Sequence, residues 1–348
     1  MRVRDLRYKL LGKSGLRASE LCLGTMTFGE DWGWGASQVE SEKIFRTFAD
    51  KGGNFIDTSI NYTNGTSEKF LGEFIHGDRD RFVIATKYSL TTKKTDPNAG
   101  GNNRKNMFRS LEESLKHLKT DYIDLFYLHM WDYTTPIEEV MRSLDDIVRS
   151  GRVRYVGISD TPAWVVARAN ALAEARGWTS FISLQIPYSL VDRDPERELL
   201  PMARSTGLGV CAWAPLAEGL LTGKYTRKAV SAQGSEGRLN RPDWGIPEKG
   251  KPIAEKLDQV AESIGHSPAQ VALNWVRQQE GVVIPIIGAT KPQQMAENMD
   301  CLDFRLTGDQ MKLLDDASRI QLGFPLDFLT SRHVREIIFG DTFSLIDR

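Results

Sequence analysis

Short apolar runs alternate with segments of helical periodicity along most of the chain. Eight such runs recur at roughly thirty residues per unit, which is the size of a strand–helix–strand repeat. They cover residues 20–24, 54–57, 82–87, 124–129, 155–159, 181–185, 209–213 and 282–287. Between them, apolar residues fall on one helical face, as at Met107, Leu111, Leu115 and Leu118. The alternation predicts an α/β fold with a parallel sheet, either a (β/α)8 barrel or a doubly wound sheet.

Several predicted elements carry explicit start signals. Residues 8–11 and 17–19 flank a glycine-containing turn, which predicts a small hairpin ahead of the main fold. Proline preceded by Ser, Thr or Asp predicts further helix starts. These are Thr135-Pro136 and Ser267-Pro268, each with the pattern of a capping box, together with Thr161-Pro162 and Asp194-Pro195.

Two observations favour the barrel over the doubly wound sheet. The first run is followed by Gly-Thr-Met-Thr-Phe-Gly at 24–29, which lacks the glycine spacing of a dinucleotide-binding turn. Several runs also end on an ionisable residue, and the C-terminal ends of barrel strands are where this fold builds active sites. We therefore expect a single-domain TIM barrel with a hairpin over 8–18, the barrel over 20–319 and a tail over 320–348.

Charge and composition exclude several classes of function. Of the 348 residues, Lys and Arg number 45 and Asp and Glu 46, with a net charge of -1 and no basic block, so neither nucleic acid nor a membrane surface is an expected partner. Cys22, Cys211 and Cys301 lack metal-ligand or redox spacing and are predicted to be reduced core residues. The charged start of the chain and the absence of a long apolar run predict a cytoplasmic protein without a signal peptide or membrane span.

Three consecutive runs deliver ionisable side chains. Asp57 ends the second run, with Tyr62 in the following turn, while Lys87 and His129 end the third and fourth. Buried charges are costly unless paired, so these residues are predicted to meet at one rim of the barrel. The simpler alternatives are that Asp57 caps a helix, that Tyr62 is a packing residue and that His129 is a hydrogen-bonded core residue. Of the five histidines only His129 lies at a strand end, so no metal site is predicted.

Together these four side chains have the composition of a proton-delivery site. Lys87 is expected to stabilise the phenolate of Tyr62 and lower its pKa from the usual value of about 10, with Asp57 holding the lysine in place. Tyr62 then acts as a general acid toward an oxygen on which negative charge develops, as when hydride adds to a carbonyl. His129 is expected to donate a hydrogen bond to the same oxygen.

In the order of these motifs the chain resembles the aldo-keto reductase superfamily from about Tyr8 to Gly323. The resemblance rests on residues 52–62, the strand-end Lys87 and His129, Gly157-Ile158-Ser159, Gln185, the run 213–224 and residues 284–298. It implies a (β/α)8 barrel that binds NADPH across its C-terminal face, with Asp57, Tyr62, Lys87 and His129 as catalytic residues. The pattern most resembles the aryl-alcohol dehydrogenase and potassium-channel β-subunit branches.

The resemblance also assigns cofactor contacts by position. Ser159 and Gln185 would hold the nicotinamide carboxamide, and Trp213 would stack on the ring. The pyrophosphate would be lined by Pro215, Leu216, Gly219, Lys224 and Arg238, and the adenosine end by Gly288, Thr290, Gln294, Glu297 and Asn298. The wider expected cofactor site includes Gly24, Thr25, Met26, Asp57, Asp160, Ala214, Ala217 and Lys291, with Lys291 beside the 2′-phosphate.

Two residues depart from the superfamily's usual pattern. Gln294 stands where many members have an arginine for the 2′-phosphate, and Asp160 stands where an asparagine usually lies beside the carboxamide-binding serine. A carboxylate accepts a hydrogen bond from the carboxamide but cannot donate one, and its charge should favour the oxidised, positively charged ring. The equally open alternative is that Asp160 turns away and supports the start of the following helix.

Three long loops are predicted at the C-terminal face, over 26–38, 89–104 and 214–249. The first contains Phe28, Trp32 and Trp34, which with Trp131 are expected to line the substrate pocket. The tryptophans favour an apolar or aromatic carbonyl compound, but sugars also stack on tryptophan faces and stay open as substrates. The third contains a candidate anion clamp, made of Lys224, Arg227, Lys228, Arg238 and Arg241. Solvated charge and hydrophobic padding are the plainer explanations for any one of these residues.

The leading hypothesis is an NADP(H)-dependent reductase of a small-molecule aldehyde or ketone. A cofactor-binding regulatory subunit of the channel β kind would retain the same four catalytic residues and stays open, as does a barrel isomerase that uses no nicotinamide. The tail is expected either over the barrel mouth or against a partner subunit, and the second arrangement would imply a homo-oligomer. Its aromatic residues are Phe324, Phe328, Phe339 and Phe343.

Overall fold

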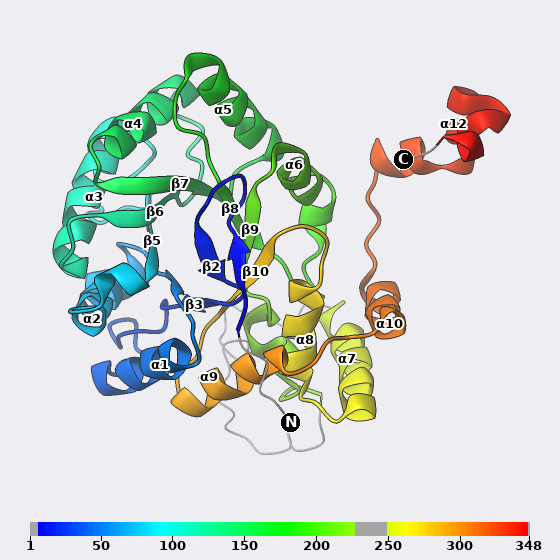
Figure 1. Cartoon of the computed structure of the whole chain (residues 1–348), viewed down its shortest axis with the longest axis horizontal. Coiled ribbons are helices and arrows are strands. Elements are labelled where there is room, and N and C mark those ends of the chain that lie inside the picture. Colours follow the sequence, from blue (N-terminus) through cyan, green and yellow to red (C-terminus); the bar gives the residue numbers. More distant parts are fainter. Residues whose placement is uncertain (1–5, 227–248, 347–348) are drawn as a thin grey trace.

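Eight parallel strands form a closed barrel in the computed structural model, which describes residues 6–226 and 249–346. The strands follow chain order around the ring, and the last one closes it against the first (Figure 1). They are β3 (Cys22–Gly24), β4 (Phe55–Asp57), β5 (Val83–Tyr88), β6 (Ile123–Leu128), β7 (Val153–Ser159), β8 (Ser183–Pro187), β9 (Gly209–Trp213) and β10 (Val283–Ile287). Each lies in or beside a predicted apolar run, so the predicted (β/α)8 barrel is confirmed and the doubly wound alternative is wrong.

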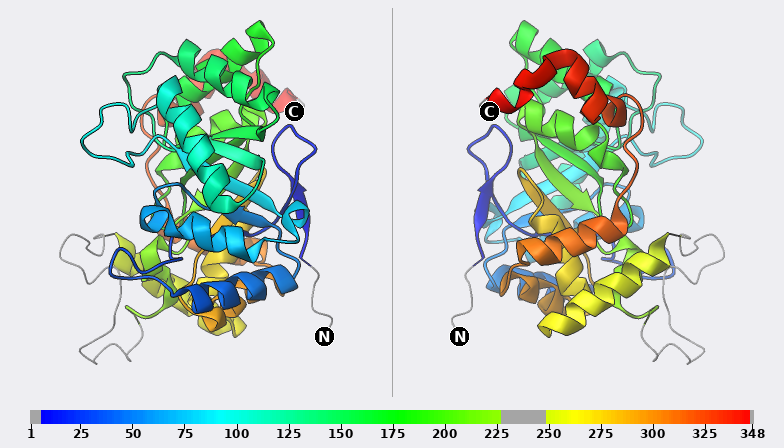
Figure 2. Two further views of the ribbon diagram at one scale, coloured as in Figure 1. Left: turned by 90° about the vertical axis from the view of Figure 1, so that its left-hand side faces the viewer. Right: turned by 90° about the vertical axis from the view of Figure 1, so that its right-hand side faces the viewer.

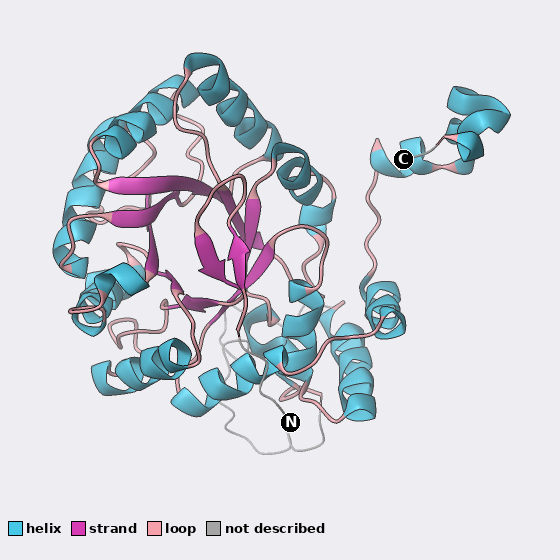
Figure 3. Cartoon of the chain, in the orientation of Figure 1, coloured by secondary structure: helices cyan, strands magenta, loops and turns pink. Residues whose placement is uncertain are grey.

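Helices cover the outside of the barrel (Figure 3). They are α1 (Gln38–Asp50), α2 (Thr66–Phe74), α3 (Arg104–Leu118), α4 (Ile137–Arg149), α5 (Ala163–Arg176), α6 (Leu199–Thr206), α7 (Gly250–Ile264), α8 (Pro268–Arg277), α9 (Pro292–Met299) and α10 (Gly308–Ser318). Their apolar stripes face the strands, as on α3, where Met107, Leu111 and Leu118 are buried.

The predicted helix starts are met in different ways. At α8 the capping box forms as expected, with Ser267 Oγ accepting from the Gln270 amide. The box predicted at Thr135 does not form, because its hydroxyl donates to Asp132 Oδ2 at 2.8 Å and α4 begins at Ile137. The Asp132 carboxylate also accepts from amides of the preceding turn and draws Thr135 away from the helix.

The N-terminal hairpin seals one end of the barrel. Strands β1 (Tyr8–Leu10) and β2 (Arg17–Ser19) pair antiparallel, as predicted, and the following Leu11 is fully buried with core residues of the barrel strands. Gly12 permits the close approach, since a Cβ there would lie 2.2 Å from the Ile182 carbonyl oxygen. Figure 2 shows the hairpin at one end of the barrel and the long loops over 26–37 and 89–103 at the opposite end.

The three free cysteines are all buried, as predicted: Cys22, Cys211 and Cys301. Burial raises the pKa of the Cys211 thiol to about 11, so it is protonated and unreactive at neutral pH. Within the described ranges, no helix is long and apolar enough to cross a membrane.

The chain leaves the barrel after α10. The tail helices α11 (Leu326–Thr330), α12 (Arg332–Phe339) and η8 (Gly340–Leu345) stand beside the barrel and away from its mouth (Figure 1). The expectation that the tail covers the mouth is therefore wrong. Large apolar side chains on it are exposed, including Phe324 and Phe328, and packing against a partner subunit stays a prediction.

A buried ion pair ties the hairpin end of the barrel to the helix layer. Arg277 at the end of α8 donates to Glu20 Oε2 at 2.8 Å, and both side chains are buried. Its guanidinium also donates to Asn274 Oδ1 and to the carbonyl oxygens of Cys301 and Phe304. One side chain therefore joins the connection before β3 to α8 and to the segment after α9.

Removing Arg277 should be among the more destabilising changes at this end of the barrel. Arg277→Ala leaves the Glu20 carboxylate buried without its partner, which typically lowers the free energy of unfolding by about 3–5 kcal/mol. Lys51→Ala is the matched control, because the Lys51–Asp300 pair, 2.7 Å long, is exposed and should contribute less than about 1 kcal/mol. Urea unfolding measures both values, and a similar small loss in the two variants would contradict a structural role for Arg277.

Candidate active site

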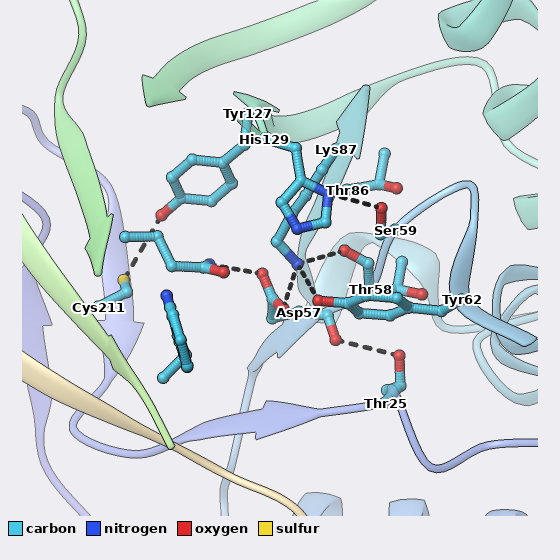
Figure 4. Close-up of polar contacts among 12 residues, drawn as sticks. Thr25, Asp57, Thr58, Ser59, Tyr62, Thr86, Lys87, Tyr127, His129 and Cys211 are labelled. Carbon is cyan, nitrogen blue, oxygen red and sulfur yellow. Dashed lines mark hydrogen bonds and ion pairs between the residues drawn. The ribbon is translucent and has the colours of Figure 1, made fainter. Parts of the chain in front are cut away.

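Strand geometry brings the ionisable residues of three neighbouring strands to one place. Side chains alternate between the two faces of a strand, so the position two after a barrel-interior residue also faces inward. Phe55 on β4 is such a core residue, so Asp57, two positions later, faces the interior at the mouth. The same rule places Lys87 on β5 and His129 after β6 at the mouth. Tyr62 joins them from η1 (Tyr62–Gly65), the turn that follows β4, as Figure 4 shows.

The Lys87 ammonium is fully buried and has three acceptors. Its Nζ donates to Asp57 Oδ2 at 2.5 Å, to the Thr58 carbonyl oxygen at 2.7 Å and to Tyr62 Oη at 3.1 Å. Burial alone would lower the pKa of Lys87, but the Asp57 charge and the Tyr62 contact outweigh it and raise the pKa, so the lysine is charged. An ammonium has only hydrogens to offer, so the Tyr62 oxygen is the acceptor and its own hydrogen remains available for another partner.

The pKa of Tyr62 is raised, so the expected lowering is wrong. Burial is the largest cause; the Lys87 charge opposes it, but the Asp57 and Asp160 charges add to it. Lys87 does not prevail because Asp57, in direct contact with it, offsets much of its field at the phenol. A phenol with a raised pKa keeps its proton at neutral pH, which makes Tyr62 a proton donor held in its protonated form.

Asp57 connects opposite sides of the mouth. While Oδ2 accepts from Lys87, Oδ1 accepts from Gln185 Nε2 of β8 at 2.8 Å. A carboxylate can only accept, so the Gln185 amide must present its nitrogen to Asp57 and turn its oxygen away. The orientation of Gln185 is thus set by the same ion pair that holds Tyr62.

His129 is oriented by two residues of the turn before Tyr62. Ser59 Oγ donates to Asn61 Oδ1 at 2.6 Å and lies 3.3 Å from His129 Nδ1. The single hydroxyl hydrogen of Ser59 points to Asn61, so His129 Nδ1 is the donor of the second contact. With Asn61 oriented in this way, the neutral ring presents Nε2 as an acceptor, which differs from the expected hydrogen bond from His129 to a substrate oxygen.

Sequence reasoning did not single out Ser59 and Asn61, although both lie between Asp57 and Tyr62. The available signal was their position. Small polar residues in the turn after a strand that carries an acid side chain are placed to orient neighbouring groups.

Ser159 and Asp160 stand at the end of β7. Ser159 is buried, and its Oγ has no hydrogen-bond partner among the described residues. Asp160 Oδ1 accepts from Trp213 Nε1 at 3.1 Å, and no side-chain hydrogen bond caps the start of α5. Burial raises the pKa of Asp160, whereas Trp213, Lys87 and the nearby Ser159 hydroxyl lower it. A buried hydroxyl without a partner is unfavourable, and a polar ligand group would satisfy it.

The predicted pyrophosphate segment follows β9. In η4 (Ala217–Thr222), Ala217 and Gly219 both have positive φ, 47° and 100°. A Cβ on Gly219 would lie 3.1 Å from Lys224 Nζ, so the lysine folds back over the glycine. Of the predicted anion clamp, Arg227, Lys228, Arg238 and Arg241 lie outside the described residues.

The predicted adenosine segment surrounds the start of α9. The helix begins at Pro292, after an exposed Lys291, and no side chain caps its first amides. Gln294 Oε1 instead accepts from Thr290 N at 3.0 Å and from Thr290 Oγ1 at 3.2 Å. Uncapped amides at a helix start favour an anion, so this end of the site suits a phosphate.

Some of the expected site residues lie in the interior. Phe28 is fully buried against Phe74, with ring centroids 6.1 Å apart, so its expected place in a substrate pocket is wrong. Its carbonyl oxygen accepts from Thr63 Oγ1 at 2.6 Å, directly after Tyr62, and thereby anchors the aromatic loop to the turn that carries the acid. The Thr25 hydroxyl donates to the Asp57 carbonyl oxygen at 3.0 Å and is likewise used inside the fold.

The tryptophans of the first long loop do stand beside the acid. The Trp32 ring lies edge-on to Tyr62 at 6.5 Å and 5.7 Å from Trp34. Trp131 is partly buried against the core, two residues after His129, and its amide donates to the Asp160 carbonyl oxygen at 3.5 Å. The mouth therefore combines a protonated tyrosine with an aromatic wall.

Comparison with known proteins places the chain. The model of the Aldo/keto reductase family matches residues 20–319. The chain belongs to this family. Similar proteins include norsolorinic acid reductase from Aspergillus flavus, 39% identical over 330 residues, with 92% of this chain and 83% of that protein covered. Aryl-alcohol dehydrogenase (NADP(+)) from Phanerodontia chrysosporium is 38% identical over 344 residues, covering 94% and 87%. The resemblance to the superfamily and to its aryl-alcohol dehydrogenases is confirmed.

His129 should make the stability of this aldo/keto reductase depend on pH. Burial, with a smaller effect of the Lys87 charge, lowers the pKa of His129 well below its ordinary value. Below about pH 6.5 the unfolded chain therefore binds one proton that the folded chain does not. The free energy of unfolding decreases as the pH is lowered, by up to about 1.4 kcal/mol per pH unit. Above about pH 6.5 this contribution is constant.

The difference between the parent chain and His129→Gln isolates this effect. Urea unfolding between about pH 5 and pH 8 should show the parent gaining stability relative to the variant as pH rises to about 6.5, and no further change above it. Curves that stay parallel over the whole range would mean that folding leaves the pKa of His129 unchanged, and would contradict the prediction.

Proposed function

We propose that this chain is an NADPH-dependent reductase of aromatic aldehydes or ketones, with Tyr62 as the proton donor. The observation that carries the proposal is the hydrogen bond from Lys87 Nζ to Tyr62 Oη at 3.1 Å. It directs the phenolic hydrogen away from the lysine, in a mouth where Trp32 stands beside the same ring. The phenolic hydrogen is therefore available to a carbonyl oxygen of a substrate in the mouth.

The residues at the mouth fit a nicotinamide dinucleotide. The buried Ser159 hydroxyl has no hydrogen-bond partner among the described residues, as a carboxamide-binding group requires. The uncapped start of α9, with Lys291 beside it, suits a phosphate. NADPH, when bound, supplies the hydride, and Ser159, Gln185 and Trp213 are the residues that would orient its ring.

The chain's own residues provide the proton. As a new C–H bond forms at the carbonyl carbon, the π electron pair of the carbonyl moves to oxygen, and Tyr62 transfers its hydrogen there. The phenolate that remains is stabilised by Lys87, which Asp57 keeps charged and in position. His129, whose Nε2 is an acceptor, would then receive a hydrogen bond from the product hydroxyl.

Two lines of support favour an aromatic substrate. Trp32, Trp34 and Trp131 supply flat apolar surface around the mouth, which packs well against a ring. The similar proteins are named for aryl alcohols and for norsolorinic acid. The aryl-aldehyde and aryl-alcohol couple is therefore the proposed substrate class.

An activity screen tests the proposal as a whole. The purified chain is assayed for NADPH and NADH consumption with aromatic aldehydes, sugars and steroid-like ketones, without any added partner. Turnover is expected with aromatic aldehydes and NADPH. Binding of NADPH without turnover of any carbonyl would instead support a regulatory subunit of the channel β kind.

Tyr62→Phe should abolish carbonyl reduction and leave NADPH affinity nearly unchanged. The loss should reach about two to four orders of magnitude in kcat, because the phenol acts on the substrate oxygen alone. Lys87→Met should lose activity to a similar extent. Tyr133→Phe, which alters an exposed tyrosine, is the control and should keep full activity. Substantial turnover by Tyr62→Phe would rule out Tyr62 as the acid.

Lys291→Ala should weaken NADPH far more than NADH. A charge-assisted contact to the 2′-phosphate is worth roughly 1.5–3 kcal/mol, so the affinity for NADPH should fall by about ten- to a hundredfold. Lys116→Ala on α3 removes an equally exposed lysine and should change neither affinity. Calorimetric titration gives the four dissociation constants, and equal losses for both cofactors would place Lys291 away from the 2′-phosphate.

A further inference from the structure

A hydrogen bond between Asp160 and Trp213 bridges two strands that are not neighbours. Asp160 follows β7 and Trp213 ends β9, while β8 pairs with both strands and lies between them. Trp213 Nε1 donates to Asp160 Oδ1 at 3.1 Å across this gap. The contact fixes the plane of the partly buried Trp213 indole. The indole lies at the mouth, as do Ser159 and Gln185.

The backbone of Asp160 is set for this contact. Its φ is 38°, in the left-handed region that only Gly, Asn and Asp adopt readily. The Asp160 amide donates to the Gln185 carbonyl oxygen at 3.3 Å, and the Asp160 carbonyl accepts from Trp131. Both backbone groups are thus occupied and the carboxylate is directed at the indole. Asparagine would tolerate the same backbone and offer an oxygen to Trp213, but without the charge.

Asp160 adds a negative charge that the mouth does not cancel. Lys87 and Asp57 neutralise each other as a buried ion pair, whereas Asp160 forms no ion pair within residues 6–226 and 249–346. Its field extends to the acid, since the Asp160 charge contributes to the raised pKa of Tyr62. A ring lying between Trp213 and Tyr62 would therefore feel this charge.

We propose that Asp160 sets the balance between the oxidised and reduced cofactor, by fixing the Trp213 indole and by placing a negative charge beside the nicotinamide ring. The inference rests on the proposed function. The oxidised ring is positively charged and the reduced ring is neutral, so the carboxylate stabilises the oxidised state relative to the reduced one. With the cofactor bound, Asp160 would favour hydride donation for the same reason, because its carboxylate would stabilise positive charge on the ring. Asp160 is a positioning and specificity-determining residue, not the source of the proton.

Asp160→Asn in the full chain separates the charge from the hydrogen bond. Dissociation constants of NADP+ and NADPH are measured by calorimetric titration, without substrate. The ratio of the NADP+ constant to the NADPH constant should rise by about three- to tenfold relative to the parent. A tenfold rise corresponds to about 30 mV in the potential of the bound two-electron couple, and it makes bound NADPH a weaker hydride donor.

Trp213→Phe supplies the matched control, because it removes the Nε1–H donor and keeps the Asp160 charge. It should weaken both cofactors by a similar factor and leave their ratio unchanged. Asp160→Asn introduced into Trp213→Phe should again raise the ratio. If the role of Asp160 were purely structural, every variant would bind NADP+ and NADPH more weakly by the same factor. That result would overturn the proposal.

Two further outcomes are distinguishable. If the parent chain binds neither NADP+ nor NADPH, the proposed function itself fails and the inference with it. If the parent binds both and Asp160→Asn, shown to be folded by circular dichroism, has an unchanged ratio, only the inference fails. Should Asp160→Asn not fold, Asp160→Ser also removes the charge and must give the same rise in the ratio for the proposal to stand.

Discussion

The buried ion pair between Lys87 and Asp57 is the constraint on which the mouth of the barrel depends. Two charges inside a protein are tolerated only when each satisfies the other, and removing one partner of such a pair typically costs about 3–5 kcal/mol. Here the pair joins adjacent strands, β4 and β5, at their C-terminal ends. Tyr62 and Gln185 are both hydrogen-bonded to it, so their positions follow from it.

Stability and chemistry are placed at opposite ends of the barrel. The hairpin, Leu11 and the Glu20–Arg277 pair close one end, where the buried ion pair is hydrogen-bonded within the chain. At the other end, the Ser159 hydroxyl and the first amides of α9 lack partners among the described residues. Polar groups that folding leaves without partners gain hydrogen bonds once a ligand binds. The second end is therefore the one suited to binding a ligand.

The fold and the meeting of four polar residues at the mouth could be predicted because each rests on a strong local rule. Strand periodicity places Asp57, Lys87 and His129 on one face, and the high energy of an unpaired buried charge implies that they meet. What failed depends on distances that a sequence does not contain. Burial of the phenol, to which the Asp57 charge adds, outweighs the Lys87 charge and raises the pKa of Tyr62. Asp132 draws Thr135 away from its helix.

The direction in which a side chain points could not be predicted from the sequence either. Phe28 belongs to an aromatic-rich loop, yet its ring turns into the core while Trp32 turns to the mouth. The hydrogen-bond donor to Asp160 was not foreseen either, because Trp213 is remote from it in sequence. The tail helices stand beside the barrel, although their composition suited a cover over its mouth.

The anchor between Thr63 and the Phe28 carbonyl oxygen has a consequence for engineering. It attaches the aromatic loop at its base, next to Tyr62, the proposed proton donor, while Trp32 and Trp34 extend beyond the anchored point. Libraries that randomise Trp32 and Trp34 can therefore reshape the entrance for new substrates with the acid left in place. Substitutions that displace Phe28 or Thr63 would instead also displace Tyr62.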